Sequence, residues 1–462
     1  MISMNLSDIA QVTDGRLSPD ADPAAVVTGP VEHDSRKVVG GALFVALVGD
    51  HADGHDFAAR AVADGAVAVL GSRAVDAPSI VVDDVLVALG KLARAVIDRL
   101  DDLTVIGLTG SSGKTSTKDF LAHLCRALGP TVAPEGTLNN ELGAPYTALK
   151  VDESTRYLVL EMSARHVGDL DYLTNIAPPD IGLALNVGIA HIGEFGSADA
   201  IARAKSELIA GIKPGGVAVL NADDPRVSAM RPLAPGRVVT FGTSPDADVR
   251  GVDVDTSSGL PRYTLTTATA AAPIALRLHG AHNVSNTLAA AAVAIELGMP
   301  VDVLAARASM PVSLSPRRMD VFTRADDITV IDDSYNANPD SMASAIDSLT
   351  TLGGAGRTIA VLGYMAELGD TEVAAHRELG RRAARAGVDI VIAVEDVAAP
   401  AAEAAAEAGA DATAVADQAA AIAEVCRVAR SGDTILVKGS RYRTWKVADY
   451  LHTEALTKEA HA

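Results

Sequence analysis

The chain alternates short apolar runs with longer stretches in which apolar residues recur at helical spacing. Alternation of this kind predicts right-handed βαβ crossovers and mostly parallel sheets, so the expected fold class is α/β. Strands are predicted at 41–47, 66–70, 104–109, 157–161, 181–186, 217–221, 328–332, 358–362, 389–394 and 434–438. Helices are predicted at 85–100, 114–128, 199–212, 285–297, 340–349, 372–386, 399–408 and 416–429.

The length of 462 residues predicts about three domains. Breaks in the pattern at Asp101–Asp102 and at the Pro- and Ser-containing segment 311–316 suggest where they divide. We predict a small mixed α/β N-terminal domain over 1–102, a central domain with a mostly parallel sheet over 103–312, and a doubly wound, Rossmann-like domain over 313–462. Within the central domain, the Thr-, Asp- and Gly-rich stretch 247–273 predicts an antiparallel insertion.

A glycine-containing loop joins the strand at 104–109 to the helix at 114–128. It consists of Gly110, Ser111, Ser112, Gly113, Lys114 and Thr115. Glycines let backbone N–H groups approach an anion, and the helix N-terminus adds a favourable dipole. Lys114 can reach the outer phosphates of a nucleotide, and the Thr115 hydroxyl can bind Mg²⁺. The usual first glycine is replaced by Leu108, so a glycine turn with a solvated lysine is the alternative; the flanking strand and helix favour an ATP or GTP site.

Polar side chains follow other predicted strands of the central domain. Glu161 ends the strand at 157–161, where parallel sheets gather ligands, and it is placed to hold Mg²⁺ or, alternatively, to cap a helix. His191 lies in a glycine-containing loop after the next strand and is either a functional or a structural histidine. Lys205 lies among apolar neighbours on the following helix and is either a snorkelling surface residue or a partly buried functional one.

Candidate groups also flank the boundary to the last domain. Asn283 and Asn286 can present amides to one ligand or cap the helix that follows. Arg318 follows the 311–316 segment and can clamp a phosphate once the domains close. The segment 332–339 follows a strand of the last domain, and 438–441 ends another strand with chemistry suited to a second anion.

Composition narrows the possible partners and location. The net charge is −20, from 39 basic and 59 acidic residues, which argues against nucleic acid or an anionic membrane as a general partner. The two cysteines, Cys125 and Cys426, form no disulfide framework or zinc pattern. The N-terminus lacks the features of a secretory leader, and no apolar run approaches the roughly 18 residues of a membrane span. We therefore expect a cytoplasmic protein with no membrane span.

Several motifs, taken together and in order, resemble the Mur ligases, which build the peptide stem of bacterial peptidoglycan. The resemblance spans essentially the whole chain. The motifs that carry it are 34–36, 53–57, 109–115, 137–145, 186–193, 280–286, 332–339 and 361–369. Within that family, the chain is most similar to the branch that joins D-alanyl-D-alanine to UDP-N-acetylmuramoyl-tripeptide. The Asp-Asn-Pro-Arg motif usual in the diaminopimelate-adding branch is absent, which favours the dipeptide-adding one.

The resemblance implies an ADP-forming ligase that activates a carboxylate as an acyl phosphate with ATP and two Mg²⁺ ions. It implies a monomer whose N-terminal domain binds the UDP substrate. For the nucleotide it implies the loop 110–115, Thr117, Asn283, Asn286, Arg318 and Asp333. For the metals it implies Thr115, Glu161, His191 and a carbamylated Lys205, with Lys114, Lys205, His191 and Glu161 as the catalytic set. For the substrates it implies Ser35, Arg36, His55, Asn139, Asn140, Asn336, Asn338, Lys438, Ser440 and Arg441.

Two other interpretations stay open from the sequence. The nearest is a ligase of the same superfamily with another substrate, such as a diaminopimelate- or lysine-adding enzyme or a folate polyglutamylating one. The other is a nucleotide-binding switch that turns over little ATP and works through partners. A switch needs no acceptor site, so the full set of strand-end Glu, His, Lys and Asn groups argues against it.

Overall fold

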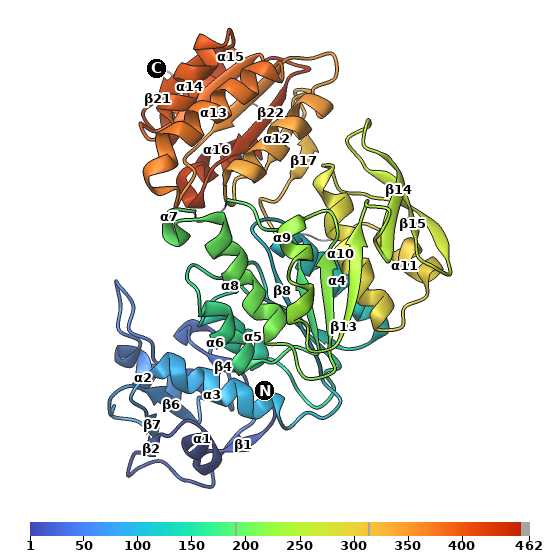
Figure 1. Cartoon of the computed structure of the whole chain (residues 1–462). Coiled ribbons are helices and arrows are strands. Elements are labelled where there is room, and N and C mark those ends of the chain that lie inside the picture. The colour runs from blue at the N-terminus through green and yellow to red at the C-terminus, as the bar shows by residue number, and fades with distance from the viewer. Residues whose placement is uncertain (190–191, 313–314, 454–462) are drawn as a thin grey trace.

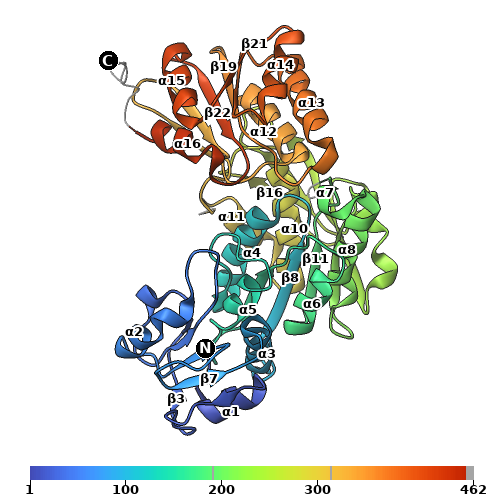
Figure 2. The ribbon, with the colours of Figure 1, turned by 90° about the vertical axis from the view of Figure 1, so that its left-hand side faces the viewer.

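The structure is a computed structural model and describes residues 1–189, 192–312 and 315–453. Three parts follow one another along a long axis (Figure 1), and the side view shows the same succession (Figure 2). Each part holds its own larger sheet, so the predicted three-domain α/β fold is confirmed. No helix in these described ranges combines the length and apolar character needed to span a bilayer.

The N-terminal part is the mixed α/β unit that the pattern predicts. In the described chain its larger sheet has the order β2-β7-β6-β5-β4, with a two-stranded ribbon of β1 and β3 beside it. The strands are β1 (Met4–Asn5), β2 (Arg16–Leu17), β3 (Val26–Val27), β4 (Val31–Glu32), β5 (Leu43–Val45), β6 (Ala68–Gly71) and β7 (Ser79–Val81). The helices are α1 (Leu6–Val12), α2 (Ala58–Ala63) and α3 (Val85–Ile97), with 3-10 turns η1 (Ser35–Lys37) and η2 (Gly54–Phe57).

The central part is built on a sheet of order β16-β15-β14-β13-β12-β11-β8-β10-β9 among the described residues. It is parallel from β9 to β14 and antiparallel from β14 to β16, which confirms the predicted insertion. The strands are β8 (Thr104–Thr109), β9 (Thr131–Val132), β10 (Tyr157–Glu161), β11 (Ile181–Ala184), β12 (Val217–Asn221), β13 (Arg237–Gly242), β14 (Val249–Asp255), β15 (Arg262–Thr266) and β16 (Ala271–Ala275).

Helices cover both faces of the central sheet. The pair α4 and α10 packs on one face, and α8 packs on the other beside α6. The helices are α4 (Lys114–Leu128), α5 (Gly143–Ala148), α6 (Asp169–Ile176), α7 (Ile192–Phe195), α8 (Ala198–Ala210), α9 (Pro225–Ser228), α10 (His282–Glu296) and α11 (Val301–Ala308). Strand β8 lies between β10 and β11, so the loop after β8 opens where the strand order reverses, a common ligand position.

The C-terminal part is doubly wound, with α12, α13 and α14 on one face of its sheet and α15 and α16 on the other. In the described residues the sheet order is β17-β18-β22-β19-β20-β21, and only the β17 edge pairs antiparallel. The strands are β17 (Asp320–Thr323), β18 (Thr329–Asp332), β19 (Thr358–Leu362), β20 (Ile390–Val394), β21 (Asp411–Val415) and β22 (Thr434–Lys438). The helices are α12 (Pro339–Leu352), α13 (Glu372–Arg385), α14 (Ala399–Glu407), α15 (Gln418–Val428) and α16 (Trp445–Leu451), with η4 (Gly369–Thr371) before α13.

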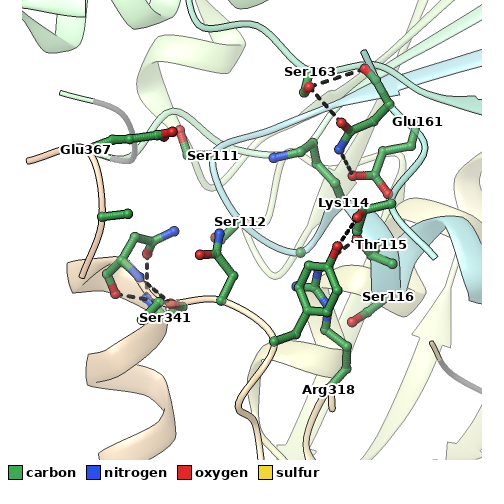
Figure 3. A pocket seen from close by; sticks show the side chains of 18 of the residues that line it. Ser111, Ser112, Lys114, Thr115, Ser116, Glu161, Ser163, Arg318, Ser341 and Glu367 are labelled. Carbon is green, nitrogen blue, oxygen red and sulfur yellow. Dashed lines mark hydrogen bonds between the residues drawn. The ribbon is translucent and has the colours of Figure 1, made fainter. Parts of the chain in front are cut away.

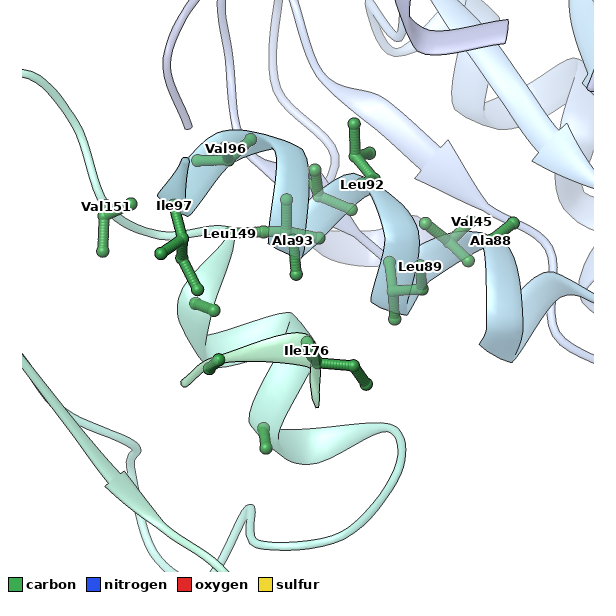
Figure 4. Packing of buried hydrophobic residues seen from close by; sticks show 14 of the residues in the cluster. Val45, Ala88, Leu89, Leu92, Ala93, Val96, Ile97, Leu149, Val151 and Ile176 are labelled. Carbon is green, nitrogen blue, oxygen red and sulfur yellow. The ribbon is translucent and has the colours of Figure 1, made fainter. Parts of the chain in front are cut away.

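The hydrophobic core does not stop at the first predicted boundary. One cluster of buried residues runs from the N-terminal sheet through α3 into α5, α6 and α8 of the central part. Figure 4 shows Leu92 and Ala93 of α3 above Ile176 of the central part, with Leu149 beside Ala93. A buried carboxylate adds a polar contact, because the Tyr146 hydroxyl donates to both oxygens of Glu32 at 3.0 and 3.1 Å. The domain limits at 102/103 and 312/313 stay predictions about independent folding units.

Candidate functional site

The loop after β8 is held in shape before any ligand binds. The Asn186 side-chain oxygen accepts hydrogen bonds from the backbone N–H groups of Ser111 and Ser112 at 3.0 and 2.9 Å. The Lys114 ammonium folds back to the Gly110 carbonyl at 2.8 Å. Gly113 has φ +76°, and a Cβ there would collide with the Asn286 side-chain oxygen, so this position requires glycine.

Glu161 ends β10 beside this loop and has one oxygen to spare. Its Oε1 accepts a hydrogen bond from the Asn139 amide at 2.7 Å, and Ser163 in turn donates to the Asn139 oxygen at 2.9 Å. Its Oε2 is buried and has no hydrogen-bond partner among the described residues. An unpartnered buried carboxylate oxygen is costly, so this strand-end oxygen is suited to accept a cationic ligand.

Two lysines near the loop have lowered pKa values. Burial lowers the pKa of Lys114, the Glu161 carboxylate raises it in part, and the Arg318 charge lowers it further. Lys205, on α8, is only 4% exposed, and burial holds its pKa well below the usual range, with the Lys114 charge lowering it further. Burial therefore favours the neutral amine of Lys205 over its ammonium form.

The C-terminal part closes over the loop through Arg318. The Arg318 guanidinium donates to the Thr115 hydroxyl at 3.1 Å. Its central carbon lies 4.3 Å from the centre of the Tyr335 ring, over which it stacks. The Tyr335 hydroxyl also hydrogen-bonds Thr137 of the central part. These contacts place side chains from both parts at one junction.

The junction encloses a cavity of about 770 Å³ (Figure 3). Fifteen of the sequence-predicted site residues line it: Ser111, Ser112, Gly113, Lys114, Thr115, Asn139, Asn140, Glu161, Asn286, Arg318, Asp333, Asn336, Asn338, Lys438 and Arg441. Among the C-terminal members, Arg318 precedes β17, three residues follow β18, Lys438 ends β22 and Arg441 follows it. Lys438 is 2% exposed and its ammonium lies 2.5 Å from the Asp333 carboxylate, so this cation is already neutralised.

Other predicted residues lie behind the cavity wall. Thr117 is fully buried and donates to the Asn286 side-chain oxygen at 3.3 Å, and Asn286 donates to the Asn283 oxygen at 3.0 Å. Ser440 is also fully buried; its hydroxyl donates to the Ala337 carbonyl at 2.9 Å and accepts from the Ala366 N–H at 3.1 Å. These side chains, with the Gly110 carbonyl that accepts from Lys114, support the residues that line the cavity, and Lys205 is likewise buried outside the lining.

The predicted uridine-binding residues lie apart from the cavity, in the N-terminal part. Ser35 and Arg36 form η1, where the Arg36 guanidinium is 78% exposed and pairs with Asp34 at 2.8 Å. The His55 side chain is fully buried, with Nδ1 2.6 Å from Asp53 and Nε2 accepting the Ser72 N–H at 3.0 Å. Both ring nitrogens of His55 are thus engaged, so any contribution to ligand binding acts through the loop that it holds.

His191 lies outside the described residues, so its predicted metal role stays a prediction. Among the residues that are described, no three or more His, Cys, Asp and Glu side chains cluster as a ready-made metal site. Thr115 and Glu161 lie together in the cavity wall, as expected. Oxygen ligands from a nucleotide would have to complete that coordination sphere.

Sequence reasoning missed several residues that line the cavity. Asn186, Arg165, Tyr335 and Glu367 all line it. The motifs 186–193, 332–339 and 361–369 could have indicated all of them except Arg165. Backbone strain gives another signal, available only from the structure. Non-glycine residues with left-handed φ gather on the C-terminal side of the junction: Arg317 at +60°, Met319 at +52°, Glu367 at +62° and Arg441 at +59°.

Comparison with protein families gives matches over most of the chain. Residues 30–96 match the model described as Mur ligase family, catalytic domain. Residues 108–294 match the Mur ligase middle domain, and residues 317–441 match the Mur ligase, glutamate ligase domain.

Similar curated proteins and solved structures cover nearly the full length. The UDP-N-acetylmuramoyl-tripeptide–D-alanyl-D-alanine ligase of Mycobacterium tuberculosis is 44% identical, over 95% of this chain and 96% of its own. The ligase of the same name from Escherichia coli is 36% identical, over 96% of each chain. A crystal structure of MurF from Acinetobacter baumannii has a TM-score of 0.88 at 33% identity, covering 98% of this chain and 99% of its own. MurF from Thermotoga maritima, in complex with ADP, has a TM-score of 0.80 at 30% identity, covering 94% and 99%.

Proposed function

The chain belongs to the Mur ligase family, and on that premise we propose that it joins D-alanyl-D-alanine to UDP-N-acetylmuramoyl-tripeptide with hydrolysis of ATP to ADP. The observation that carries the proposal is the shared cavity. The glycine loop of the central part and the strand-end loops of the C-terminal part face one another across it. A ligase needs this arrangement, because the triphosphate and the incoming amine must meet at one carboxylate.

The residues present fit a divalent cation. Glu161 offers a buried, unpartnered oxygen, and the Thr115 hydroxyl opens the helix beside it. We propose that Thr115 and Glu161 hold one Mg²⁺, and that His191 and a carbamylated Lys205 hold a second. Bound there, Mg²⁺ would offset the negative charge that gathers when a carboxylate approaches a triphosphate. The lowered pKa of Lys205 supports carbamylation, because only a neutral amine adds CO₂.

The reaction then follows from what the side chains do. The loop amides and Lys114 bind the phosphates, while Arg318 closes over them from the other part. The terminal carboxylate of the tripeptide attacks the γ-phosphorus, and ADP leaves with the electrons of the broken P–O bond. The free amine of D-alanyl-D-alanine attacks the resulting acyl phosphate through a tetrahedral intermediate, and inorganic phosphate leaves. The enclosing junction excludes water, which would otherwise hydrolyse the acyl phosphate.

The remaining predicted residues have proposed binding roles. We propose that Asn286, supported by Asn283 and Thr117, contacts adenine and that Asp333 contacts the ribose. Asn139 and Asn140 lie toward the sugar phosphates of the UDP substrate, and η1 with the loop held by His55 seats its uridine end. Asn336, Asn338, Lys438, Ser440 and Arg441 form or support the wall that receives the dipeptide. We further propose that the enzyme acts as a monomer in the cytoplasm.

A coupled assay tests the function. Phosphate release from ATP is measured with UDP-N-acetylmuramoyl-tripeptide and D-alanyl-D-alanine, alone and together. We expect release only with both substrates, because the acyl phosphate turns over when the amine arrives. In parallel reactions, UDP-N-acetylmuramoyl-dipeptide replaces the tripeptide substrate, and free diaminopimelate or lysine replaces D-alanyl-D-alanine. Faster release there would assign another ligase activity, and release independent of any acceptor would favour a nucleotide switch.

A further inference from the structure

A pair of arginines at the cavity has no role in the proposed nucleotide site. Arg165 follows β10 in the central part, and Arg441 follows β22 in the C-terminal part. Both approach the same carboxylate oxygen, Glu367 Oε1: Arg441 donates to it at 3.1 Å, and the Arg165 Nε lies 3.6 Å away. Glu367 comes from the loop after β19 and lies at the opposite end of the pocket from Arg318 in Figure 3.

The backbone around all three side chains is fixed. The N–H groups of Arg165 and His166 both donate to the Asp169 carboxylate at 2.8 Å. The Glu367 loop is held by a hydrogen bond from the Met365 N–H to the buried His376 ring at 3.1 Å. Glu367 and Arg441 both have left-handed φ, a costly conformation that persists where surrounding contacts enforce it.

The remaining cations of the cavity are already engaged. Lys114 lies in the phosphate loop, Arg318 stacks on Tyr335, and Lys438 is paired with Asp333. By contrast, the side chains of Arg165 and Arg441 are 64% and 56% exposed and share one carboxylate. Two guanidiniums carry ten N–H donors, and Glu367 neutralises one of the two charges, so the pair can accept a further carboxylate between the two parts.

We propose that Arg165 and Arg441 form a two-domain clamp for a carboxylate of a peptide substrate, with Glu367 holding the guanidiniums in place. This inference rests on the proposed function, which supplies two sources of such a group. One is the terminal carboxylate of the dipeptide. The other is a side-chain carboxylate on the third residue of the stem peptide. The clamp joins groups from both parts, so substrate bound there also favours the closed arrangement.

The test compares substrates that differ by that one group, using the full-length enzyme. In one arm, D-alanyl-D-alanine is compared with D-alanyl-D-alaninamide. In the other, UDP-N-acetylmuramoyl-tripeptides ending in diaminopimelate and in lysine are compared. In one arm, Arg165→Ala and Arg441→Ala should each lower kcat/KM about tenfold or more for the substrate that carries the carboxylate. For the matched substrate that lacks it, kcat/KM should stay within about twofold of the wild-type value. Whichever arm responds identifies the carboxylate.

A matched control removes a similar arginine away from the cavity. Arg385 on α13 is 69% exposed and pairs with Glu378 at 3.4 Å, so Arg385→Ala should leave all four values unchanged. Arg165→Lys keeps the positive charge but loses the planar guanidinium. Compared with Arg165→Ala, it should recover part of the preference for the carboxylate-bearing substrate. Equal losses on both forms in both arms would overturn the clamp while leaving the ligase assignment intact. A wild-type enzyme that ligates no combination would overturn the proposed function and the clamp with it.

Discussion

The two junctions between the three parts of the molecule are built in opposite ways. The N-terminal part meets the central part through one continuous apolar cluster, in which α3 packs against α5 and α6. The C-terminal part has separate hydrophobic clusters of its own, and Ile192 is the described central residue packed against them. Apart from Ile192, the contacts described at its junction with the central part are polar and lie around the cavity.

The difference indicates which parts move together. Burying a shared core makes separation of the first two parts costly, so they should behave as one body. Hydrogen bonds and exposed ion pairs contribute little net stability, because water replaces them when they break. We therefore expect the C-terminal part to be the one that moves away to admit substrates, with the first two parts as its rigid support.

The largest expected effect comes from the opening junction. Lys114→Ala should lower turnover by at least about a thousandfold, because a phosphate-binding cation is lost where charge accumulates. Its unfolding temperature should stay close to that of the wild type. Phosphate release and differential scanning calorimetry measure the two quantities. Unchanged turnover would refute the phosphate-loop assignment.

A substitution at the junction between the N-terminal and central parts should instead lower the free energy of unfolding. Leu92 is fully buried in the shared cluster, and Leu92→Ala should cost about 2–5 kcal/mol of unfolding free energy. Trp445 is the single tryptophan and lies in the C-terminal part, so its fluorescence reports that part alone, while circular dichroism reports the whole. We expect urea unfolding to shift in circular dichroism but not in fluorescence. A common shift would show that all three parts unfold as one unit.

Lys205→Ala tests the buried lysine behind the cavity wall, whose pKa burial lowers. Turnover should fall about a hundredfold and recover in part when short carboxylic acids are added, because they can supply the missing oxygen ligand. Lys213→Ala is the control, since that lysine is 39% exposed and pairs with Asp180 at 3.0 Å. Full activity of Lys205→Ala without added acid would eliminate the carbamate.

A smaller loss of turnover is expected when a bulkier residue is placed between the central and C-terminal parts. The Gly193 N–H donates to the Glu367 carbonyl at 3.1 Å, and a Cβ on Gly193 would lie 2.6 Å from the Gly369 nitrogen. Gly193→Ala should therefore reduce turnover about tenfold without loss of stability. Small-angle scattering with an ATP analogue and the UDP substrate should show compaction of the wild type and less of the variant. Gly40→Ala, where a Cβ meets nothing within 4 Å, is the control.

Sequence patterning predicts most of this architecture because βαβ alternation and strand-end motifs are local signals. The strands at 157–161, 217–221, 358–362 and 434–438 agree with the structure to the residue, as does the helix at 114–128. The shared core was not predicted. The break at Asp101–Asp102 follows the end of α3 at Ile97, but the partners of the apolar face of α3 are set by tertiary packing.

The site was predicted less completely than the fold. A motif gives the loop on which a residue lies, and not the direction of its side chain. Thr117, Asn283 and Ser440 were therefore predicted as ligand contacts, although their side chains are buried behind the residues that line the cavity. Conversely, the pairing of Arg165 with Glu367 was not predicted, although Glu367 lies in the motif 361–369, because it depends on two parts of the chain meeting.

Asn186 has a consequence for the speed of nucleotide capture. Its side-chain oxygen already occupies the Ser111 and Ser112 amides, so the loop has its shape from the moment the chain folds. We therefore expect nucleotide binding to require little ordering of the loop backbone. The association rate of the nucleotide should therefore be limited by its diffusion to the loop and not by a change in loop conformation.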